Sequence, residues 1–274
     1  MEQLPIRCVI MRGGTSKGLF LRFNDLPADP ALRDRVILAL FGSPDPRQID
    51  GLGGADILTS KVMIVGPPSR PDADVDYLFG QVSITEPVVD YDINCGNLSA
   101  AVGVYAIQEG FVRAREPTTR VRMYNWNTRR VLVAEVPVKE GSPRVEGSCR
   151  IDGVPGTGAE VVLDYAQSVG ATTDHLLPTG AERDEVFVPE LDRNVPVSVV
   201  DVANACVFFP AEVLGWRLER QNLAALQTAV ETLLRTLLWR GRLPAYWLIL
   251  GPDEEVVPVY ALAGTYQARP AGGR

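Results

Sequence analysis

The chain has 274 residues, of which 46% are hydrophobic and 22% are charged, which is the composition of an ordinary globular protein. Its formal net charge of −7 and its pI of about 4.9 argue against a nucleic-acid partner, because nucleic-acid-binding proteins concentrate positive charge. No apolar run reaches the roughly 18 residues of a membrane span, and residues 1–5 lack the basic and apolar regions of a signal peptide. We therefore expect neither a membrane partner nor secretion.

Cysteine and histidine usage narrows the chemistry further. The four cysteines, Cys8, Cys95, Cys149 and Cys206, are too widely spaced for a zinc site or a disulfide framework. The single histidine, His175, rules out a multi-histidine metal site. It also leaves a Ser-His-Asp triad or a cysteine hydrolase without a well-placed histidine. We expect a cytoplasmic protein with no metal site.

In chain order, the first feature is a glycine-rich loop between two predicted strands. Residues 6–10 and 19–21 are apolar enough to be strands, and residues 11–18 (MRGGTSKG) join them. A phosphate-binding loop must open a helix, so this context is wrong for one. Backbone N–H groups, two hydroxyls and Lys17 can still form an anion-binding nest. A tight hairpin that exposes Lys17 explains the same residues equally well.

A predicted helix and a long loop precede a second lysine of interest, Lys61. Residues 30–41 have helical periodicity, and residues 42–56 form a loop rich in glycine, proline and aspartate, of a length that is usually functional or disordered. The loop runs into a predicted strand at 58–65, which carries Lys61 near its start. Burial there would remove water from the amine and lower its pKa toward the range of a general base. A plain surface lysine is the alternative.

The stretch 92–101 (DINCGNLSAA) is the one around which we expect the chain to be organised. From residue 98 to about 109, apolar residues recur at helical intervals. Asn94 or Asn97 is predicted to cap this helix, which puts Cys95 at its N-terminus. Free N–H groups and the helix dipole would stabilise a thiolate or a bound carboxylate there. The alternative is that Cys95 is a small buried apolar residue.

Further strands are predicted on both sides of this helix. Those before residue 186 are residues 77–82, 119–125, 130–136 and 161–165, together with a strand-like run at 82–85 that resumes at 88–89 after a proline. Residues 195–214 then repeat the pattern found at the start of the chain, with a strand, a small-residue loop, a strand and the start of a helix. We therefore expect two similar domains, residues 1–185 and residues 186–274.

Six short motifs occur in the order that is found in one protein family. They are residues 11–18 (MRGGTSKG), 42–45 (GSPD), 48–51 (QIDG), 59–61 (TSK), 76–79 (DYLF) and 94–97 (NCGN). Together they resemble the PrpF protein family, which contains 2-methylaconitate cis–trans isomerases and 4-oxalomesaconate tautomerases. The resemblance covers residues 6 to about 214.

The resemblance implies an α+β fold like that of diaminopimelate epimerase. In that fold two related domains each wrap a curled sheet around a central helix. The family's catalytic lysine and cysteine match Lys61 and Cys95, and the chemistry needs no cofactor. The residues that the resemblance implies for substrate binding are Arg12, Gly14, Thr15, Ser16, Lys17, Ser60, Asn94, Gly96, Asn97 and Leu98.

The implied activity moves a proton on an unsaturated tricarboxylate by acid–base catalysis. Keto–enol tautomerisation of 4-oxalomesaconate is favoured, because residues 43–50 and 54–56 look closer to the tautomerase branch. Cis–trans isomerisation of 2-methylaconitate is the alternative. The expected partner is a small unsaturated polycarboxylate, with a homodimer as one option for the assembly.

The last part of the chain departs from the family pattern. Beyond Gly215 the resemblance stops, and residues 217–242 are predicted to form a helix with a broad apolar stripe. Only the run at 246–250 and a tail follow, and Pro258 in that tail disfavours a central strand. The second domain is therefore expected to be incomplete and to expose apolar surface. An inactive homologue whose exposed helix docks a partner is an alternative hypothesis.

Overall fold

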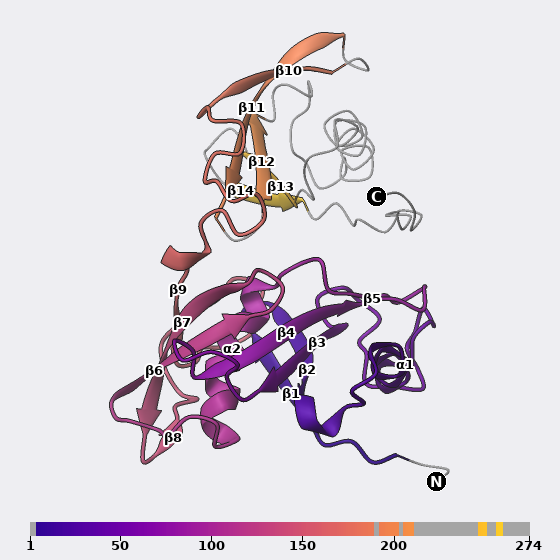
Figure 1. The fold of residues 1–274 in the computed structure, drawn as a ribbon, viewed down its shortest axis with the longest axis vertical. Helices are drawn as coiled ribbons and strands as arrows, with labels where there is room; N and C mark the ends of the chain where they lie inside the picture. The colour runs from indigo at the N-terminus through magenta and orange to yellow at the C-terminus, as the bar shows by residue number, and fades with distance from the viewer. Residues whose placement is uncertain (1–3, 189–191, 203–204, 211–245, 251–255, 260–274) are drawn as a thin grey trace. The chain divides into compact units, whose positions relative to one another are not determined.

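The computed structural model of the chain describes residues 4–188, 192–202, 205–210, 246–250 and 256–259 (Figure 1). The chain divides into two compact units, Met1–Ser168 (unit 1) and Val169–Arg274 (unit 2). The boundary expected from the sequence, after residue 185, lies later in the chain. All the residues that the sequence proposes for the site belong to unit 1.

Unit 1 is built on one mixed sheet. Its strands pair in the order β1-β2-β3-β4-β6-β7-β8, with β5 paired to β4 and β9 paired to β7. The pairs β2/β3 and β4/β6 are parallel, and the other neighbouring pairs are antiparallel. The strands are β1 (Cys8–Gly13), β2 (Ser16–Arg22), β3 (Lys61–Gly66), β4 (Val75–Val82), β5 (Val89–Asp90), β6 (Thr118–Asn125), β7 (Arg130–Lys139), β8 (Ser142–Pro143) and β9 (Val162–Asp164).

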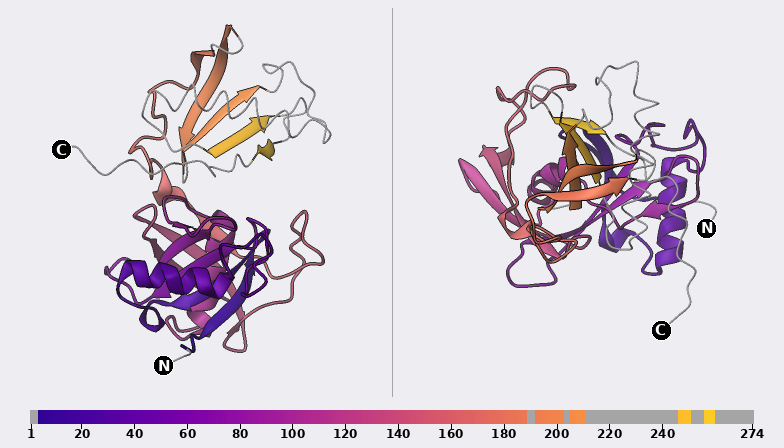
Figure 2. Two further views of the ribbon diagram at one scale, coloured as in Figure 1. Left: turned by 90° about the vertical axis from the view of Figure 1, so that its right-hand side faces the viewer. Right: turned by 90° about the horizontal axis from the view of Figure 1, so that it is seen from above.

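The helices α1 (Pro30–Phe41) and α2 (Gly96–Gln108) pack on opposite faces of this sheet. Met63 of β3 belongs to the apolar core around α2, whereas its neighbours Val62 and Ile64 belong to the core around α1. The sheet curls around α2 and leaves α1 outside the curl (Figure 1, Figure 2). Burial on both faces explains why β3 reads as a continuous apolar run and not as an alternating one.

Helix α1 begins and ends where the sequence predicts. Asp29 caps its N-terminus, with a side-chain oxygen that accepts a hydrogen bond from the Leu32 N–H at 2.8 Å. Pro30 occupies the first helical position, where a missing N–H costs nothing. Gly42 ends the helix in the left-handed conformation (φ 71°), which glycine adopts without strain.

Most predicted strands are confirmed, including the one at 77–82, but the strand-like run predicted at 82–85 does not continue beyond Val82. In the structure β4 ends at Val82. The Ile84 carbonyl accepts a hydrogen bond from the Asp45 N–H (2.9 Å), and the Ser83 N–H donates to the Val88 carbonyl (3.0 Å). The prediction for 83–85 is wrong because a loop distant in the sequence and a local turn use the backbone groups that a strand would have needed.

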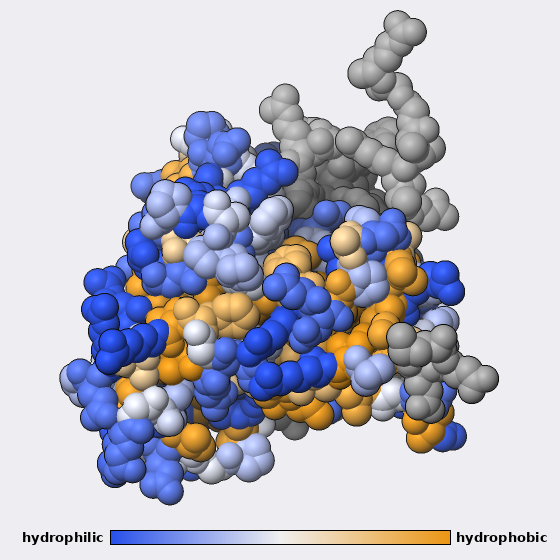
Figure 3. All heavy atoms as spheres, turned by 60° about the horizontal axis from the view of Figure 1, so that its bottom comes forward, coloured by the Kyte–Doolittle hydropathy of each residue, from blue (hydrophilic) through white to orange (hydrophobic). Residues whose placement is uncertain are grey.

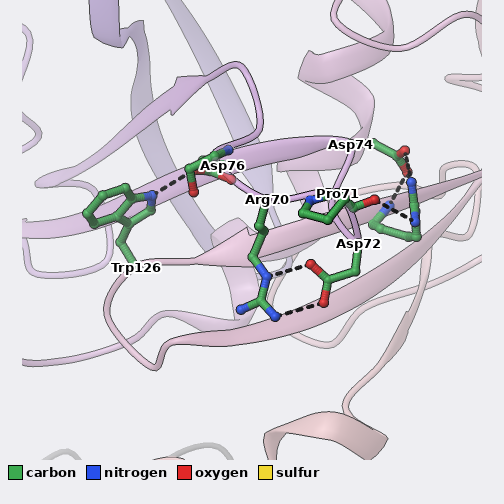
Figure 4. Close-up of polar contacts among 8 residues, drawn as sticks. Arg70, Pro71, Asp72, Asp74, Asp76 and Trp126 are labelled. Carbon is green, nitrogen blue, oxygen red and sulfur yellow. Dashed lines mark hydrogen bonds and ion pairs between the residues drawn. The ribbon is translucent and has the colours of Figure 1, made fainter.

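Three carboxylates fix the turn between β3 and β4 (Figure 4). Asp72 pairs with Arg70, Asp74 pairs with Arg122 on β6, and Asp76 accepts a hydrogen bond from the Trp126 indole. Hydrogen bonding from Arg122 holds the pKa of Asp74 below its usual value. No group of His, Cys, Asp and Glu residues in the described part of the chain could hold a metal ion. These carboxylates therefore serve the turn and its attachment to β6.

Unit 2 contains a second sheet with the strand order β10-β11-β12-β13-β14. Its strands are β10 (Asp184–Val188), β11 (Arg193–Asp201), β12 (Ala205–Pro210), β13 (Tyr246–Leu250) and β14 (Val256–Val259). The predicted strands at 195–200 and 206–209 are confirmed. The run β11 to β14 pairs antiparallel, parallel and antiparallel, which is the pairing pattern of β1 to β4. The tail contributes strand β14, which contains Pro258. Strand β14 is the last in the strand order, and proline is tolerated in a strand at the end of such an order.

The predicted helix at 217–242 lies outside the described residues, and so does the apolar stripe that we expected on it. On the face shown in Figure 3, hydrophobic residues are interspersed with hydrophilic ones. Exposed apolar side chains such as Ile10, Ile49 and Val145 occur in unit 1. No described helix is long and apolar enough to cross a membrane.

Candidate functional site

Helix α2 begins at a cysteine. Cys95 is its N-cap residue, with an extended backbone (φ −123°, ψ 98°), and its sulfur accepts a hydrogen bond from the Leu98 N–H at 3.5 Å. The prediction that Asn94 or Asn97 caps the helix is wrong. Asn94 is buried and accepts a hydrogen bond from the Asn125 amide (2.8 Å), and Asn97 lies inside the first turn. The prediction that Cys95 lies at the helix N-terminus is confirmed.

The glycine-rich loop is a tight hairpin that packs on this helix terminus. Gly14 and Thr15 join β1 to β2, and the Asn97 side-chain amide donates hydrogen bonds to the hydroxyls of Thr15 (2.9 Å) and Ser16 (3.4 Å). Gly14 has a positive φ of 52°, and a Cβ there would collide with the Asn97 side chain. The hairpin alternative is thus correct for the backbone, but Lys17 is half-buried and not exposed.

Lys61 is the first residue of β3, and its side chain is buried. Its residue exposure is 8%, and its Nζ donates a hydrogen bond to the Gln81 amide oxygen at 2.7 Å. The Nζ also lies 5.2 Å from the centre of the Phe79 ring. Loss of hydration on burial lowers the pKa of Lys61, while Cys95 and Asp56 act electrostatically in the opposite direction. The prediction of a buried lysine with a lowered pKa is confirmed.

Lys61 and Cys95 face the same side of the sheet. The side chains of β3 alternate, so Lys61 points to the face that Met63 presents to α2, and Cys95 belongs to the apolar core on that face. Gly18 of β2 lies between the first turn of α2 and the start of β3. A Cβ on Gly18 would lie 2.6 Å from Leu98 Cδ1 and 2.7 Å from the Lys61 carbonyl oxygen. The absence of a side chain at Gly18 lets the first turn of α2 approach the start of β3.

A group of tyrosines lies beside Cys95. A Cβ on the exposed Gly96 would lie 3.0 Å from the Tyr165 hydroxyl, so this hydroxyl is next to the first residue of α2. Burial raises the pKa of Tyr165 to about 12, and the Cys95 sulfur adds to this effect. The buried Tyr77 hydroxyl lies 3.0 Å from the Ser99 hydroxyl, which donates to the Cys95 carbonyl at 2.9 Å. Tyr165 therefore stays protonated and remains a hydrogen-bond donor at neutral pH.

The long loop at 42–56 is ordered by one buried amide. Gln48 is only 1% exposed, and its oxygen accepts hydrogen bonds from the Ala55 N–H (2.8 Å) and the Ser60 hydroxyl (2.8 Å). Its side-chain nitrogen donates to the Ser43 hydroxyl at 2.9 Å. Ser60, which the resemblance implies for substrate binding, is fully buried with its hydroxyl used in this way. Ser60 directly precedes Lys61, so this hydrogen bond ties the start of β3 to the 42–56 loop.

The structure gathers most of the candidate residues and separates a few. Gly14, Thr15, Ser16, Gly96, Asn97 and Leu98 meet at the first turn of α2. The Lys17 Nζ reaches toward the loop, 3.4 Å from where a Cβ on Gly54 would be. The Arg12 guanidinium is exposed and donates to the Gly14 carbonyl (2.8 Å), so it braces the hairpin turn. The side-chain oxygen of Asn94 accepts a hydrogen bond from the Asn125 amide.

Two residues near the site, Gln81 and Tyr165, were not singled out by the sequence, and a third, Gln48, was noted only as part of the 48–51 motif. Gln81 and Tyr165 occupy strand-like runs, and Gln48 lies in a loop; only the pairing of distant segments brings them here. The available signal for Gln81 was a polar residue inside an apolar strand next to the 76–79 motif. A half-buried polar side chain in such a strand needs a partner, and that partner is Lys61.

The arrangement combines a desolvated amine, a thiol and the N–H groups of a helix N-terminus. The amine can take a proton, the thiol can give one, and the helix N-terminus can hold a carboxylate. These are the elements of acid–base catalysis on an anionic substrate. The sequence of residues 3–235 matches the family described as PrpF protein.

The chain belongs to the PrpF family. The 3-methylitaconate isomerase of Eubacterium barkeri is 58% identical over 211 residues, which cover 77% of this chain and 55% of that protein. The 4-oxalomesaconate tautomerase of Pseudomonas putida is 46% identical over 252 residues, which cover 92% of this chain and 66% of that protein. The match continues to residue 235, past the limit near 214 that the motifs gave. The chain spans less than two thirds of either relative.

Solved structures agree with this assignment. The crystal structure of a methylitaconate-delta-isomerase is 46% identical with a TM-score of 0.73, over 92% of this chain and 72% of that one. A probable proline racemase from Agrobacterium radiobacter is 14% identical with a TM-score of 0.55, over 92% of this chain and 69% of that one. At that identity the likeness concerns the fold alone. This PrpF-family chain therefore has a proline racemase/epimerase-like fold, with a curled mixed sheet in unit 1.

Proposed function

We propose that this PrpF-family protein shifts a proton on a small unsaturated polycarboxylate, with Lys61 and Cys95 as the acid–base pair and without a cofactor. The observation that carries the proposal is the Lys61 amine, buried at 8% exposure on the face of the sheet where Cys95 begins α2. Burial lowers the pKa of this amine and so increases the fraction that is neutral and able to accept a proton. The matched relatives named as isomerase and tautomerase support the same reaction class.

In the proposed reaction the neutral Lys61 amine removes a proton from a carbon conjugated with carboxyl or keto groups. The electron pair of the broken C–H bond moves into the conjugated system and gives a delocalised dienolate. The Cys95 thiol then gives a proton to another atom of the conjugated system, which is a carbon when the double bond moves along the chain and the enolate oxygen in a keto–enol tautomerisation. Lys61 is left as an ammonium and Cys95 as a thiolate, and proton transfer between them restores the starting state. The net reaction is an isomerisation, and the reverse direction exchanges the two roles.

The first turn of α2 is the proposed binding site for a substrate carboxylate. The N–H groups at a helix N-terminus attract an anion, and Gly96 leaves the terminus open to solvent. The exposed Thr15 hydroxyl accepts a hydrogen bond from Asn97, so its own hydrogen remains available to a carboxylate. Developing charge on the dienolate would be stabilised by the same groups.

Three candidate substrates belong to this class. The motif at 43–50 favours 4-oxalomesaconate, whose keto–enol tautomerisation is the activity that we expected from the sequence. The higher identity to the relative named 3-methylitaconate isomerase, 58% against 46%, favours a methylated dicarboxylate. The resemblance also keeps 2-methylaconitate as an alternative. All three are unsaturated polycarboxylates with an acidic C–H, so removal of the proton to a delocalised enolate is common to them, and they differ in the atom that is reprotonated.

Turnover of these acids tests the proposal. We expect the purified 274-residue chain to change the ultraviolet absorbance of one of the three acids, because moving a double bond into or out of conjugation changes absorption. Each acid is followed separately, with boiled protein as the control. No change with any of the three acids would contradict the proposal.

We also propose that the two units are related domains. The shared pairing pattern of β1–β4 and β11–β14 supports this relation. A cytoplasmic location fits the thiols of Cys8, Cys95 and Cys149, which form no disulfide.

A further inference from the structure

Gln81 faces Lys61 directly across two neighbouring strands. The two residues are paired in the antiparallel register of β3 and β4, and the Lys61 Nζ donates to the Gln81 Oε1 at 2.7 Å. The Gln81 Nε2 donates to two backbone carbonyls, those of Ile57 (3.1 Å) and Ser60 (2.8 Å). A single amide thus links the lysine to the end of the loop that precedes it.

The hydrogen bonds of Gln81 fix which way its amide points. An amide nitrogen has two hydrogens, and both are taken by carbonyl oxygens, which cannot donate in return. A flipped amide would set its oxygen against these two carbonyls and its N–H₂ group against the Lys61 amine, which is also a donor. Only the observed orientation gives a hydrogen-bond partner to the Lys61 amine, to both carbonyls and to the amide itself. The Gln81 oxygen must therefore face Lys61.

We propose that Gln81 is a positioning residue that holds the Lys61 amine by one N–H and leaves its lone pair free for the substrate. Its value lies in being a neutral acceptor. An amide oxygen accepts from both the ammonium and the neutral amine, whereas a carboxylate in the same place would favour the ammonium and suppress the base. The catalytic meaning of this inference rests on the proposed function, but the effect of Gln81 on the amine is a property of the chain itself.

Other charged groups near Lys61 do not replace this role. Cys95 at the start of α2 and Asp56 in the preceding loop act on the amine electrostatically, and both favour its charged form. Gln81 does not titrate, so it keeps the amine in place on both sides of its proton transfer. The geometry also explains a half-buried polar side chain in the apolar strand β4.

Two substitutions of Gln81 should shift the titration of Lys61 in opposite directions. In Gln81→Glu a carboxylate faces the amine, and the fraction of neutral amine at neutral pH should fall by about tenfold or more. In Gln81→Met the volume is kept but the acceptor is lost, so the charged amine loses its hydrogen bond and the neutral fraction should rise. A residue that only supports the fold would not give opposite shifts.

The readout is acetylation of Lys61 as a function of pH, measured by mass spectrometry of its peptide, since only the neutral amine reacts. Gln108→Glu is the matched control, because Gln108 is exposed at the far end of α2 and its replacement should leave the Lys61 profile unchanged. Circular dichroism checks the fold of each variant. If Gln81→Glu does not fold, Gln81→Met decides alone: a downward shift in the Lys61 titration supports the proposal, and an unshifted or upward one overturns it.

The same variants separate this inference from the proposed function. If the wild-type chain turns over none of the three acids, the proposed function fails, while the labelling profiles still decide the role of Gln81. If turnover is present and both Gln81 variants leave the Lys61 profile where it was, only the Gln81 inference fails. With both correct, the ascending limb of the pH–rate profile should move to higher pH in Gln81→Glu, in parallel with the labelling.

Discussion

Replacing Lys61 with methionine should lower the turnover of the unsaturated acid by about 10²–10⁴-fold, because the reaction loses its base. Methionine keeps most of the volume of the lysine stem, so the sheet around β3 should be retained. The matched control is Lys139→Met, since Lys139 is exposed at the end of β7 and should be replaceable without effect on turnover. The measurement is the initial rate at saturating substrate. A Lys61→Met variant with a rate near that of the wild type would show that another group removes the proton.

The same variant should change how stability depends on pH. The pKa of Lys61 is lowered in the folded chain from an ordinary value of 10.5. Between the lowered value and 10.5 the unfolded chain binds the extra proton, so the stability of the wild type rises as pH rises through this window. Lys61→Met lacks this contribution. Urea unfolding at about pH 7 and about pH 10 should therefore show the free energy of unfolding of the wild type gaining on that of the variant at the higher pH.

Replacing Cys95 with serine should also lower turnover by about 10²–10⁴-fold, because a hydroxyl gives up its proton far less readily than a thiol. The fold should not suffer. Cys95 caps α2 through its sulfur, and serine is among the best N-cap residues, so the melting temperature should be kept or raised.

Cys149→Ser is the control for the Cys95 variant. Cys149 is half-buried and lies far along the chain, in an isolated bridge to Gly158, and its replacement should leave turnover unchanged. Loss of activity in Cys95→Ser together with a lowered melting temperature would point to a structural role. Full activity in Cys95→Ser would remove the thiol from the mechanism.

Local signals predicted much of unit 1. Helix α1 was predictable because its cap, its proline and its terminal glycine all lie within the segment itself. The buried lysine was predictable because Lys61 opens an apolar run next to a glycine-rich loop. The position of Cys95 followed from the change from strand-like to helical periodicity around it.

The errors arose where distant residues compete for the same group. Asparagine is preferred over cysteine as an N-cap, yet both asparagines have long-range partners: Asn94 is bound by Asn125 and Asn97 binds Thr15. The strand prediction at 83–85 failed for a similar reason, because the carbonyl of Ile84 is taken by the loop at 42–56. Side-chain partners remote in sequence leave no periodic signal.

The roles of Gln81 and Tyr165 were invisible for a different reason. Neither residue type marks chemistry by itself, and each acquires a role only from what the folded sheet places next to it. Gln81 meets Lys61 through strand register, and Tyr165 reaches Gly96 from the position directly after β9, a strand that pairs with β7. A buried polar residue in a strand is a signal that a partner exists, but the partner is set by the fold.

The central claim, a proton shift carried by Lys61 and Cys95, is tested most directly by turnover in deuterium oxide followed by proton NMR. Both groups exchange protons with solvent, so the product should carry deuterium at the carbon that receives the proton. Lys61→Met and Cys95→Ser should show neither product nor deuterium exchange into the substrate beyond about one hundredth of the wild-type rate. Product that forms without deuterium, or exchange at the wild-type rate in both variants, would contradict the account.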